Sequence, residues 1–241
     1  MTELTWLILP TYNEAENIEA IVTASAQTLA ACSPNGFRIL IVDDDSPDGT
    51  GQIGERLASE RSEVEILHRA IREGLGPAYL AGFEHALSRG ADFIMEMDSD
   101  FSHSPSDLER LLRTVRDGGA DLALGSRYVP GGGIENWSAS RRVISRGGSL
   151  YARIILSLPV TDLTGGFKCF RADVLRAIDL PSVTARGYAF QIELTYRAIE
   201  RGFKVVEVPI VFRDRVAGKS KMSWQITAEA AWLVPLMRLR R

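Results

Sequence analysis

The chain has 241 residues, which is enough for one large domain or for one domain with an appendage. Hydrophobic residues make up 45% of it and charged residues 24%, the balance of a folded globular protein, so an intrinsically disordered chain is excluded. The 28 basic and 31 acidic side chains leave a formal charge of −3, which argues against a general nucleic-acid-binding protein. Its two cysteines, Cys32 and Cys169, are too few for a disulfide framework and indicate reduced thiols in a cytosolic protein.

Through its first half the chain alternates short apolar runs with helical spacings. We predict strands over residues 4–9, 37–42, 64–67, 93–97 and 121–124, and between them helices over 18–29, 50–59, 75–88 and 105–115. This alternation predicts an α/β fold with a mostly parallel sheet and helices on both faces. Ligands of such sheets bind at the carboxyl ends of the strands.

The second half has a different character. It predicts a flexible joint at 131–133, an arginine-bearing helix over 140–158, a loop at 164–166, a helix over 188–200, a strand over 205–212 and a terminal helix over 222–241. We therefore expect one α/β domain over residues 1–221 and a C-terminal amphipathic helix over 222–241. The longest uncharged stretch, 20–37, contains too many polar residues for a transmembrane helix, and no signal peptide is evident.

Acidic side chains gather where predicted strands end. Asp98-Ser99-Asp100 follows one strand and Asp43-Asp44-Asp45 another, and the clusters adjoin if these strands are sheet neighbours. Carboxylates two residues apart share one side of an extended segment, and a divalent cation relieves their repulsion. Mg²⁺ or Mn²⁺ suits such oxygen ligands and also binds nucleotide phosphates. Each cluster is equally compatible with a solvated loop that caps the next helix.

The first predicted strand ends in Pro10-Thr11-Tyr12-Asn13-Glu14. Tyr12 is placed to flank a nucleotide base and Glu14 to accept hydrogen bonds from it. The alternative is an ordinary turn between a strand and a helix. The residues of this turn do not decide between the two.

Seven segments in chain order carry a resemblance to a known family: LPTYNEAENI, IVDDDSPDGT, GLGPAYLAGF, MDSDFSHSPSDL, GSRYVPGGG, DLTGGFKCFR and FRDRVAGKSKM. Together they resemble the polyprenol-phosphate (dolichol-phosphate) mannose synthases of the family-2 glycosyltransferases, over residues 9–222. YNE and DD are typical of the broad family, whereas SPDGT and DSDFSH indicate the mannosyl-phosphoprenol branch. The resemblance implies a GT-A nucleotide-sugar fold. It also implies transfer of mannose from GDP-mannose to a polyprenyl monophosphate with inversion, giving a β-mannosyl phosphate.

The resemblance also implies a donor site. It places the guanosine against Pro10, Tyr12, Glu14, Val42 and Asp44. Asp98 and Asp100 fall on the metal and diphosphate acids of the family, with Ser99 between them where alanine is usual. Ser102 stands where some relatives carry a glutamine ligand, so the resemblance supplies no third protein ligand for the metal.

Basic residues are expected to contact both phosphate groups. Arg127, Arg215 and Lys221 fall on the phosphate contacts of the family, so we expect them, with Asp100, to be catalytic. The acceptor phosphate is expected to contact Arg127, Arg141, Arg142 and Arg146. Because the second pKa of a phosphate monoester is about 6, the lipid phosphate is already largely ionised at neutral pH and needs no dedicated base. Glu193 is therefore only a weak candidate for one.

A membrane surface is the expected place of action. The row Arg142, Arg146, Ser149 and Arg153 lies along one helix face, with Ile144, Tyr151, Ile154, Ile155 and Leu158 beside it. Such a helix suits an anionic lipid interface, although an ordinary amphipathic helix has the same pattern. The terminal helix, with Trp224 and Trp232, suits either a headgroup boundary or packing on the core.

Some relatives continue into transmembrane helices beyond this point. We therefore expect a peripheral protein at the cytoplasmic face of the membrane, with surface binding or a separate anchoring subunit and with no nucleic-acid partner.

Two other functions remain open from the sequence. One is a polyprenyl-phosphate glucosyltransferase that uses UDP-glucose. The other is a receiver-type signalling module, which also places acids at strand ends but is shorter, at about 120 residues.

Overall fold

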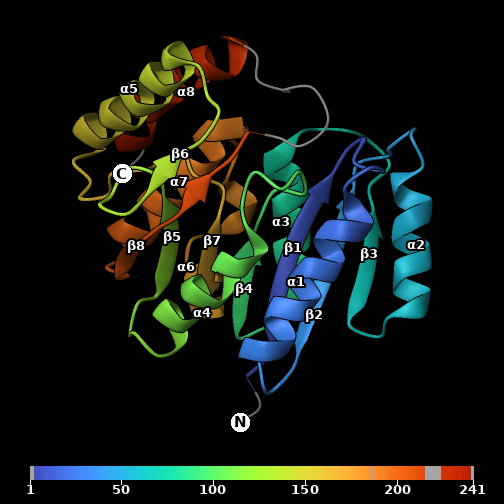
Figure 1. Ribbon diagram of the computed structural model, residues 1–241. Helices are drawn as coiled ribbons and strands as arrows, with labels where there is room; N and C mark the ends of the chain where they lie inside the picture. The colour runs from blue at the N-terminus through green and yellow to red at the C-terminus, as the bar shows by residue number, and fades with distance from the viewer. Residues whose placement is uncertain (1–2, 186, 215–223, 240–241) are drawn as a thin grey trace.

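The computed structural model describes residues 3–185, 187–214 and 224–239 (Figure 1). In chain order its elements are β1 (Thr5–Thr11), α1 (Ile18–Cys32), β2 (Phe37–Asp43), α2 (Thr50–Glu60), β3 (Val64–His68), α3 (Leu75–Ser88), β4 (Phe93–Glu96), η1 (Pro105–Asp107), α4 (Leu108–Arg116), β5 (Leu122–Ser126), β6 (Gly133–Ile134), α5 (Ala139–Leu156), β7 (Lys168–Arg171), α6 (Ala172–Ala177), η2 (Leu180–Ser182), α7 (Gly187–Glu200), β8 (Val205–Pro209), β9 (Val211–Phe212) and α8 (Trp224–Leu239).

A seven-stranded sheet in the order β3-β2-β1-β4-β7-β5-β8 forms the centre of the molecule. β7 is antiparallel to both of its neighbours, and the other pairings of this sheet are parallel. β6 and β9 form a separate two-stranded sheet. The prediction of an α/β fold with a mostly parallel sheet is confirmed.

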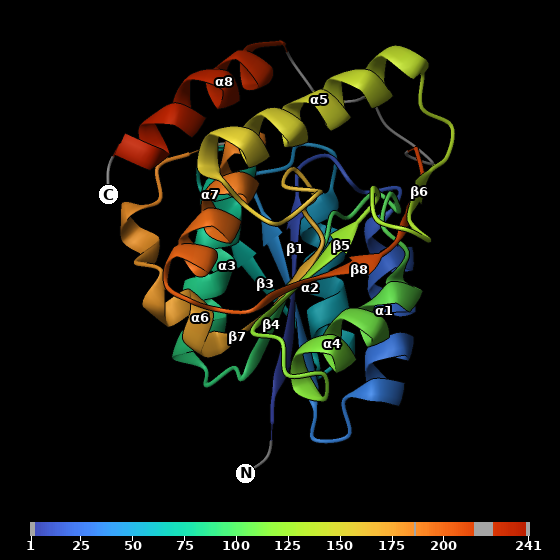
Figure 2. The ribbon, with the colours of Figure 1, turned by 90° about the vertical axis from the view of Figure 1, so that its left-hand side faces the viewer.

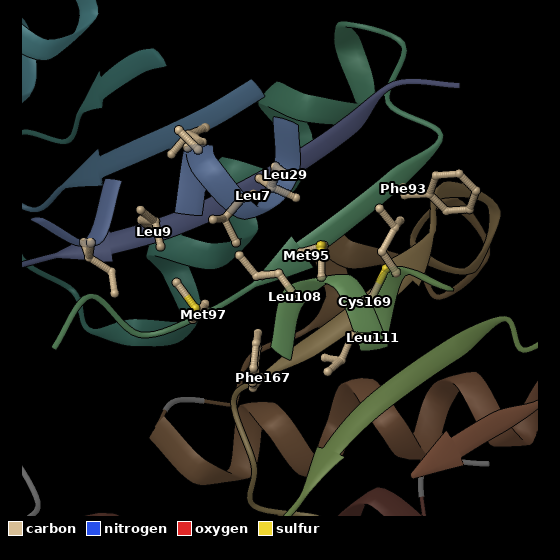
Figure 3. Packing of buried hydrophobic residues seen from close by; sticks show 14 of the residues in the cluster. Leu7, Leu9, Leu29, Phe93, Met95, Met97, Leu108, Leu111, Phe167 and Cys169 are labelled. Carbon is tan, nitrogen blue, oxygen red and sulfur yellow. The ribbon is translucent and has the colours of Figure 1, made fainter. Parts of the chain in front are cut away.

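Helices cover both faces of the sheet because its strands are apolar on both sides. In β1, Leu7 and Leu9 enter one hydrophobic cluster, whereas Trp6 and Ile8 enter the other. α1, α2 and α4 cover the first face and α3, α6 and α7 the second (Figures 1 and 2). Figure 3 shows side chains of β1 and α4 gathered in the first cluster.

α5 and α8 lie side by side at the end of the molecule toward which the parallel strands point (Figures 1 and 2). Ala152 and Leu156 of α5 pack with Val234 of α8 and with Ile192 and Tyr196 of α7. The boundary predicted at residue 221 lies outside the described residues.

Four sequence predictions are wrong in detail. β7 and α6 were not predicted, because a four-residue strand that begins with a lysine has no visible period. The strand predicted over 205–212 is two strands, since β8 ends at Pro209, which has no N–H for the ladder, and β9 pairs with β6. Gly133 belongs to β6 rather than to a flexible joint. β2 and β4 are not neighbours, because β1 lies between them.

A buried ion pair fixes β7 in the sheet. Lys168 Nζ lies 3.0 Å from Glu96 Oε1 of β4, and both side chains are fully buried. The ammonium also donates to the main-chain and side-chain oxygens of Gln191 in α7. Burial raises the pKa of Glu96 and lowers the pKa of Lys168, while the attraction between the two charges opposes both shifts. The pair thus ties β4, β7 and α7 together.

We expect Lys168→Met to lower the free energy of unfolding by about 3 kcal/mol, because it leaves Glu96 as an uncompensated buried acid. Urea denaturation measures this loss. The double variant Lys168→Met/Glu96→Gln should be less destabilised than Lys168→Met alone, since it removes the charge as well as its partner. A Lys168→Met protein that unfolds at the wild-type urea concentration contradicts this account.

Candidate active site

The three polar strand ends predicted from the sequence meet at one edge of the sheet. β1 lies between β2 and β4, so its terminal segment separates the two acidic clusters and hydrogen-bonds to both. Asp44 N donates to Thr11 O over 3.1 Å, and Ser99 Oγ donates to Pro10 O over 2.9 Å. The hydroxyl of Ser99 is thereby directed at the main chain of β1, and this small side chain is buried.

Tyr12 and Glu14, which were predicted to contact the nucleoside, are held in defined positions at this edge. The guanidinium carbon of Arg72 lies 3.9 Å from the centre of the Tyr12 ring. Glu14 is buried, its Oε2 accepts from Asn17 Nδ2 over 3.0 Å, and its main-chain N donates to Thr50 Oγ1 over 2.9 Å. The side chain of Val42 packs in the core of the second face, so only its main chain borders the edge.

The Asp98-Ser99-Asp100 loop turns back sharply after β4. Phe101 adopts the left-handed conformation with a φ of 60°, and Ser102 N donates to Asp100 Oδ1 over 3.0 Å. Asp100 is buried, whereas the Asp98 side chain is 30% exposed. His103 Nδ1 lies 3.9 Å from Asp98 Oδ2, and burial lowers the pKa of His103 to about 4, so its ring is neutral at pH 7.

These residues fit a cation that is shared with a substrate. Within the part of the chain that the structure describes, no group of three or more His, Cys, Asp or Glu side chains is arranged to hold a metal. Two carboxylates can hold Mg²⁺ or Mn²⁺ when phosphate oxygens and water complete the coordination. Asp98 and Asp100 therefore suit a metal that binds together with a nucleotide diphosphate.

Arg127 follows β5 and forms a buried ion pair that the sequence did not predict. Its Nε and Nη2 donate to the two oxygens of Asp162 over 2.7 and 2.6 Å, and Nη2 also donates to Thr164 Oγ1 over 2.9 Å. The rings of Trp137 and Phe212 lie 5.6 and 5.5 Å from its guanidinium carbon. Only the DLTGG segment, which carries both partners, could have indicated this contact.

The predicted acceptor arginines divide into two groups. Arg141 Nη1 donates to Asp214 Oδ1 over 2.9 Å, and its guanidinium carbon lies 4.0 Å from the centre of the Trp137 ring. Arg142 and Arg146 are exposed on α5. Ser149, predicted to share their row, is buried against Thr164. Of the remaining predicted phosphate contacts, Arg215 and Lys221 lie outside the described residues.

Glu193 is engaged in a structural contact. Its carboxylate accepts from Arg197 one turn later on α7 and from Ala185 N over 3.3 Å. Arg197 in turn donates to the main-chain oxygens of Ile178, Asp179 and Ser182. These contacts indicate that Glu193 fixes the segment before α7 and does not act as a general base.

A sheet of this topology with an acidic edge at the ends of β1, β2 and β4 defines a GT-A nucleotide-sugar transferase. The model of the family described as Glycosyl transferase family 2 matches residues 6–179. The chain belongs to this family and is a glycosyltransferase.

Two curated relatives match almost the whole chain. The polyprenol monophosphomannose synthase of Mycolicibacterium smegmatis is 49% identical over 234 residues, which cover 97% of this chain and 86% of the relative. The undecaprenyl-phosphate mannosyltransferase of Micrococcus luteus is 48% identical over 223 residues, covering 92% and 89%.

Solved structures share the fold at low identity. The glucosyl-3-phosphoglycerate synthase of Mycobacterium tuberculosis, in complex with Mn²⁺, uridine diphosphate and glucosyl-3-phosphoglycerate, superposes with a TM-score of 0.67. It is 18% identical, and the match covers 98% of this chain and 80% of that one. A protein of the same fold therefore binds Mn²⁺ with a nucleoside diphosphate.

We expect Glu193→Gln to retain most of the rate of glycosyl transfer and to lower the free energy of unfolding by about 1 kcal/mol, because it weakens the contact with Arg197. Steady-state kinetics and thermal unfolding measure the two effects. A hundredfold or greater loss of rate with unchanged unfolding, the size of a typical general-base effect (~10²–10⁴), would instead identify Glu193 as a base.

Proposed function

We propose that this glycosyltransferase moves mannose from GDP-mannose to a polyprenyl monophosphate with inversion, giving polyprenyl β-mannosyl phosphate. The observation that carries the proposal is the near-full-length identity of 49% and 48% to two enzymes named as polyprenyl-phosphate mannosyltransferases. The meeting of the predicted nucleoside and diphosphate residues at one sheet edge supports it.

The proposed reaction is a single in-line displacement. An oxygen of the lipid phosphate forms a bond to the anomeric carbon of mannose, and the bond from that carbon to GDP breaks with both electrons leaving on GDP. The lipid phosphate is already largely ionised at neutral pH. No side chain has to remove a proton, which agrees with the structural contact of Glu193.

The roles of individual residues follow from their places at the sheet edge. Asp98 and Asp100 would hold Mg²⁺ or Mn²⁺, which would supply positive charge to the diphosphate leaving group. From the resemblance, Arg127, Arg215 and Lys221 would add positive charge to the diphosphate, and of these three Arg127 lies within the described residues. Arg127 is fixed by Asp162, so its guanidinium needs no reorganisation when charge develops.

The outer face of α5 supports approach to a lipid surface. Val143, Leu150 and Ile154 project from one side of this helix, and the first and last are 71% and 64% exposed. With about 3.6 residues per turn, Arg142, Arg146 and Arg153 lie along one border of this apolar stripe. α8 lies beside α5 (Figure 2), and its Trp232 is 73% exposed. An apolar stripe bordered by arginines suits the headgroup region of an anionic membrane.

We therefore infer peripheral action at the cytoplasmic face of a membrane, with the acceptor phosphate bound by Arg127, Arg141, Arg142 and Arg146. Ile155 and Leu158, predicted to belong to the apolar surface, instead pack in the core with α7 and α8. Among the described helices, none is both long and apolar enough to cross a bilayer. A separate anchoring subunit stays a prediction from the sequence.

The experiment that tests the function is transfer of labelled mannose from GDP-mannose into an organic-extractable polyprenyl lipid, with and without Mn²⁺. We expect metal-dependent transfer and a loss of at least about a hundredfold in Asp100→Ala, because the diphosphate loses its cation. Asp173→Ala, which removes an exposed acid from α6, is the matched control and should keep the wild-type rate. Strong turnover of UDP-glucose without turnover of GDP-mannose would overturn the proposed donor.

Sedimentation with vesicles that contain anionic lipid tests the membrane surface. We expect Ile154→Glu to reduce binding about tenfold or more, because an isoleucine loses its burial in the interface. Gln52→Glu makes the same change of charge on exposed α2 and should bind like the wild type. Added salt should weaken wild-type binding through the arginines. Equal binding of Ile154→Glu and wild type would remove α5 from the contact.

A further inference from the structure

The loop between β3 and α3 contacts residues that are predicted to bind the nucleoside. Its first residue, Arg69, places Nη1 2.6 Å from Oδ1 of Asp44 and Nη2 2.6 Å from Oε2 of Glu73. The main-chain N of Arg69 donates to Asp43 O over 2.8 Å, so the start of the loop is fixed to the end of β2. Three residues further on, Arg72 lies over the Tyr12 ring. One loop thus contacts two residues predicted to bind the base.

Asp44 and Arg69 form a pair that is shielded from water. The Asp44 side chain is 6% exposed and the Arg69 side chain 13%, whereas Glu73 is 50% exposed. Burial raises the pKa of Asp44 and the neighbouring Asp43 raises it further, while Arg69 and the main-chain N–H of Gly74 lower it. Arg69 therefore works against protonation of Asp44 and directs the plane of its carboxylate.

The protonation state of Asp44 decides what it can recognise. An ionised carboxylate only accepts hydrogen bonds, whereas a protonated one also donates. Guanine presents two adjacent donors, N1–H and the 2-amino group, which match an ionised carboxylate. Hypoxanthine has lost the 2-amino group. Uracil presents a single N3–H between two carbonyl oxygens, which repel a carboxylate.

We propose that Arg69 is the positioning residue that sets the base selectivity of the nucleotide site, by holding Asp44 as an oriented, ionised acceptor for the donor edge of a guanine. This inference rests on the proposed function, since it assumes that the donor is a guanosine diphosphate sugar. Arg69 itself is assigned no contact with the sugar or with the reacting phosphate. Its effect therefore falls on donor binding and not on the chemical step.

Calorimetric binding of GDP, IDP and UDP in the presence of Mn²⁺ tests the proposal, with inosine diphosphate as the probe for the 2-amino group. We expect the wild type to prefer GDP over IDP by at least about tenfold, the value of one hydrogen bond to a charged group. In Arg69→Met the affinity for GDP should fall by a similar factor, and the GDP-to-IDP ratio should approach one. KM for GDP-mannose should rise with kcat nearly unchanged.

Two further variants separate positioning from general stability. Glu73→Gln removes the negative charge from the outer contact of Arg69 and should keep the preference for GDP. Arg69→Lys keeps the positive charge and should restore most of it. Should Arg69→Met fail to fold, Arg69→Gln removes the charge while keeping a donor, and its GDP-to-IDP ratio is read in the same way.

The outcomes distinguish this inference from the proposed function. A wild type that prefers GDP, together with a folded Arg69→Met or Arg69→Gln that keeps the same preference, overturns the role of Arg69 alone. A loss confined to kcat also overturns it. A wild type that binds UDP as tightly as GDP overturns the proposed donor and this inference with it.

Discussion

The site depends above all on how the negative charges at one edge of the sheet are compensated. β1, β2 and β4 end in acidic or polar segments, and β1 holds the two clusters apart while hydrogen-bonding to both. The protein itself compensates one of these acids, since Arg69 forms an ion pair with Asp44. For Asp98 and Asp100 the proposed compensation is a dication that arrives with the diphosphate. Binding of metal and of donor are then coupled through the same repulsion.

The two halves of the chain provide different parts of the site. The residues proposed to bind the nucleoside come from β1, β2 and the loop after β3, all within the first third of the chain. The arginines proposed to bind the acceptor come from the end of β5 and from α5. The Arg127–Asp162 pair joins the residues that precede and follow α5. It thereby fixes both ends of the segment that contains α5 and its apolar stripe.

Most of the first half could be predicted from sequence, because apolar period and turn residues agree there. The strands through Leu7, Ile41 and Met95 are mostly apolar, and acidic or polar residues follow their ends. What could not be predicted depends on partners distant in the sequence. From the sequence, the lysine at the start of β7 is expected to be exposed to solvent. It is buried because it donates hydrogen bonds to Glu96 and Gln191.

The same limit applies within the site. Positions of Tyr12, Glu14, Asp44, Asp98 and Asp100 at one edge follow from strand ends alone. The orientation of Arg127 does not, since it depends on Asp162, 35 residues further along the chain. The contact of Arg69 with Asp44 could not be predicted either, because the loop after β3 carries charged residues but no motif that indicates their partners. Local sequence pattern therefore predicts where the acidic residues lie, whereas the positions of the arginines that pair with them follow only from the folded structure.

β7 lies between two strands that precede it in the chain, and this order affects how the chain folds during synthesis. β4 and β5 are made well before β7, which pairs with both of them in the finished sheet. Until residues 168–171 emerge during synthesis, each of these strands has an unsatisfied edge that can pair with another chain. Because β8 is made later still, β4 has one open edge and β5 has two throughout the synthesis of α5. α5 is thus complete before β7 joins β4 to β5.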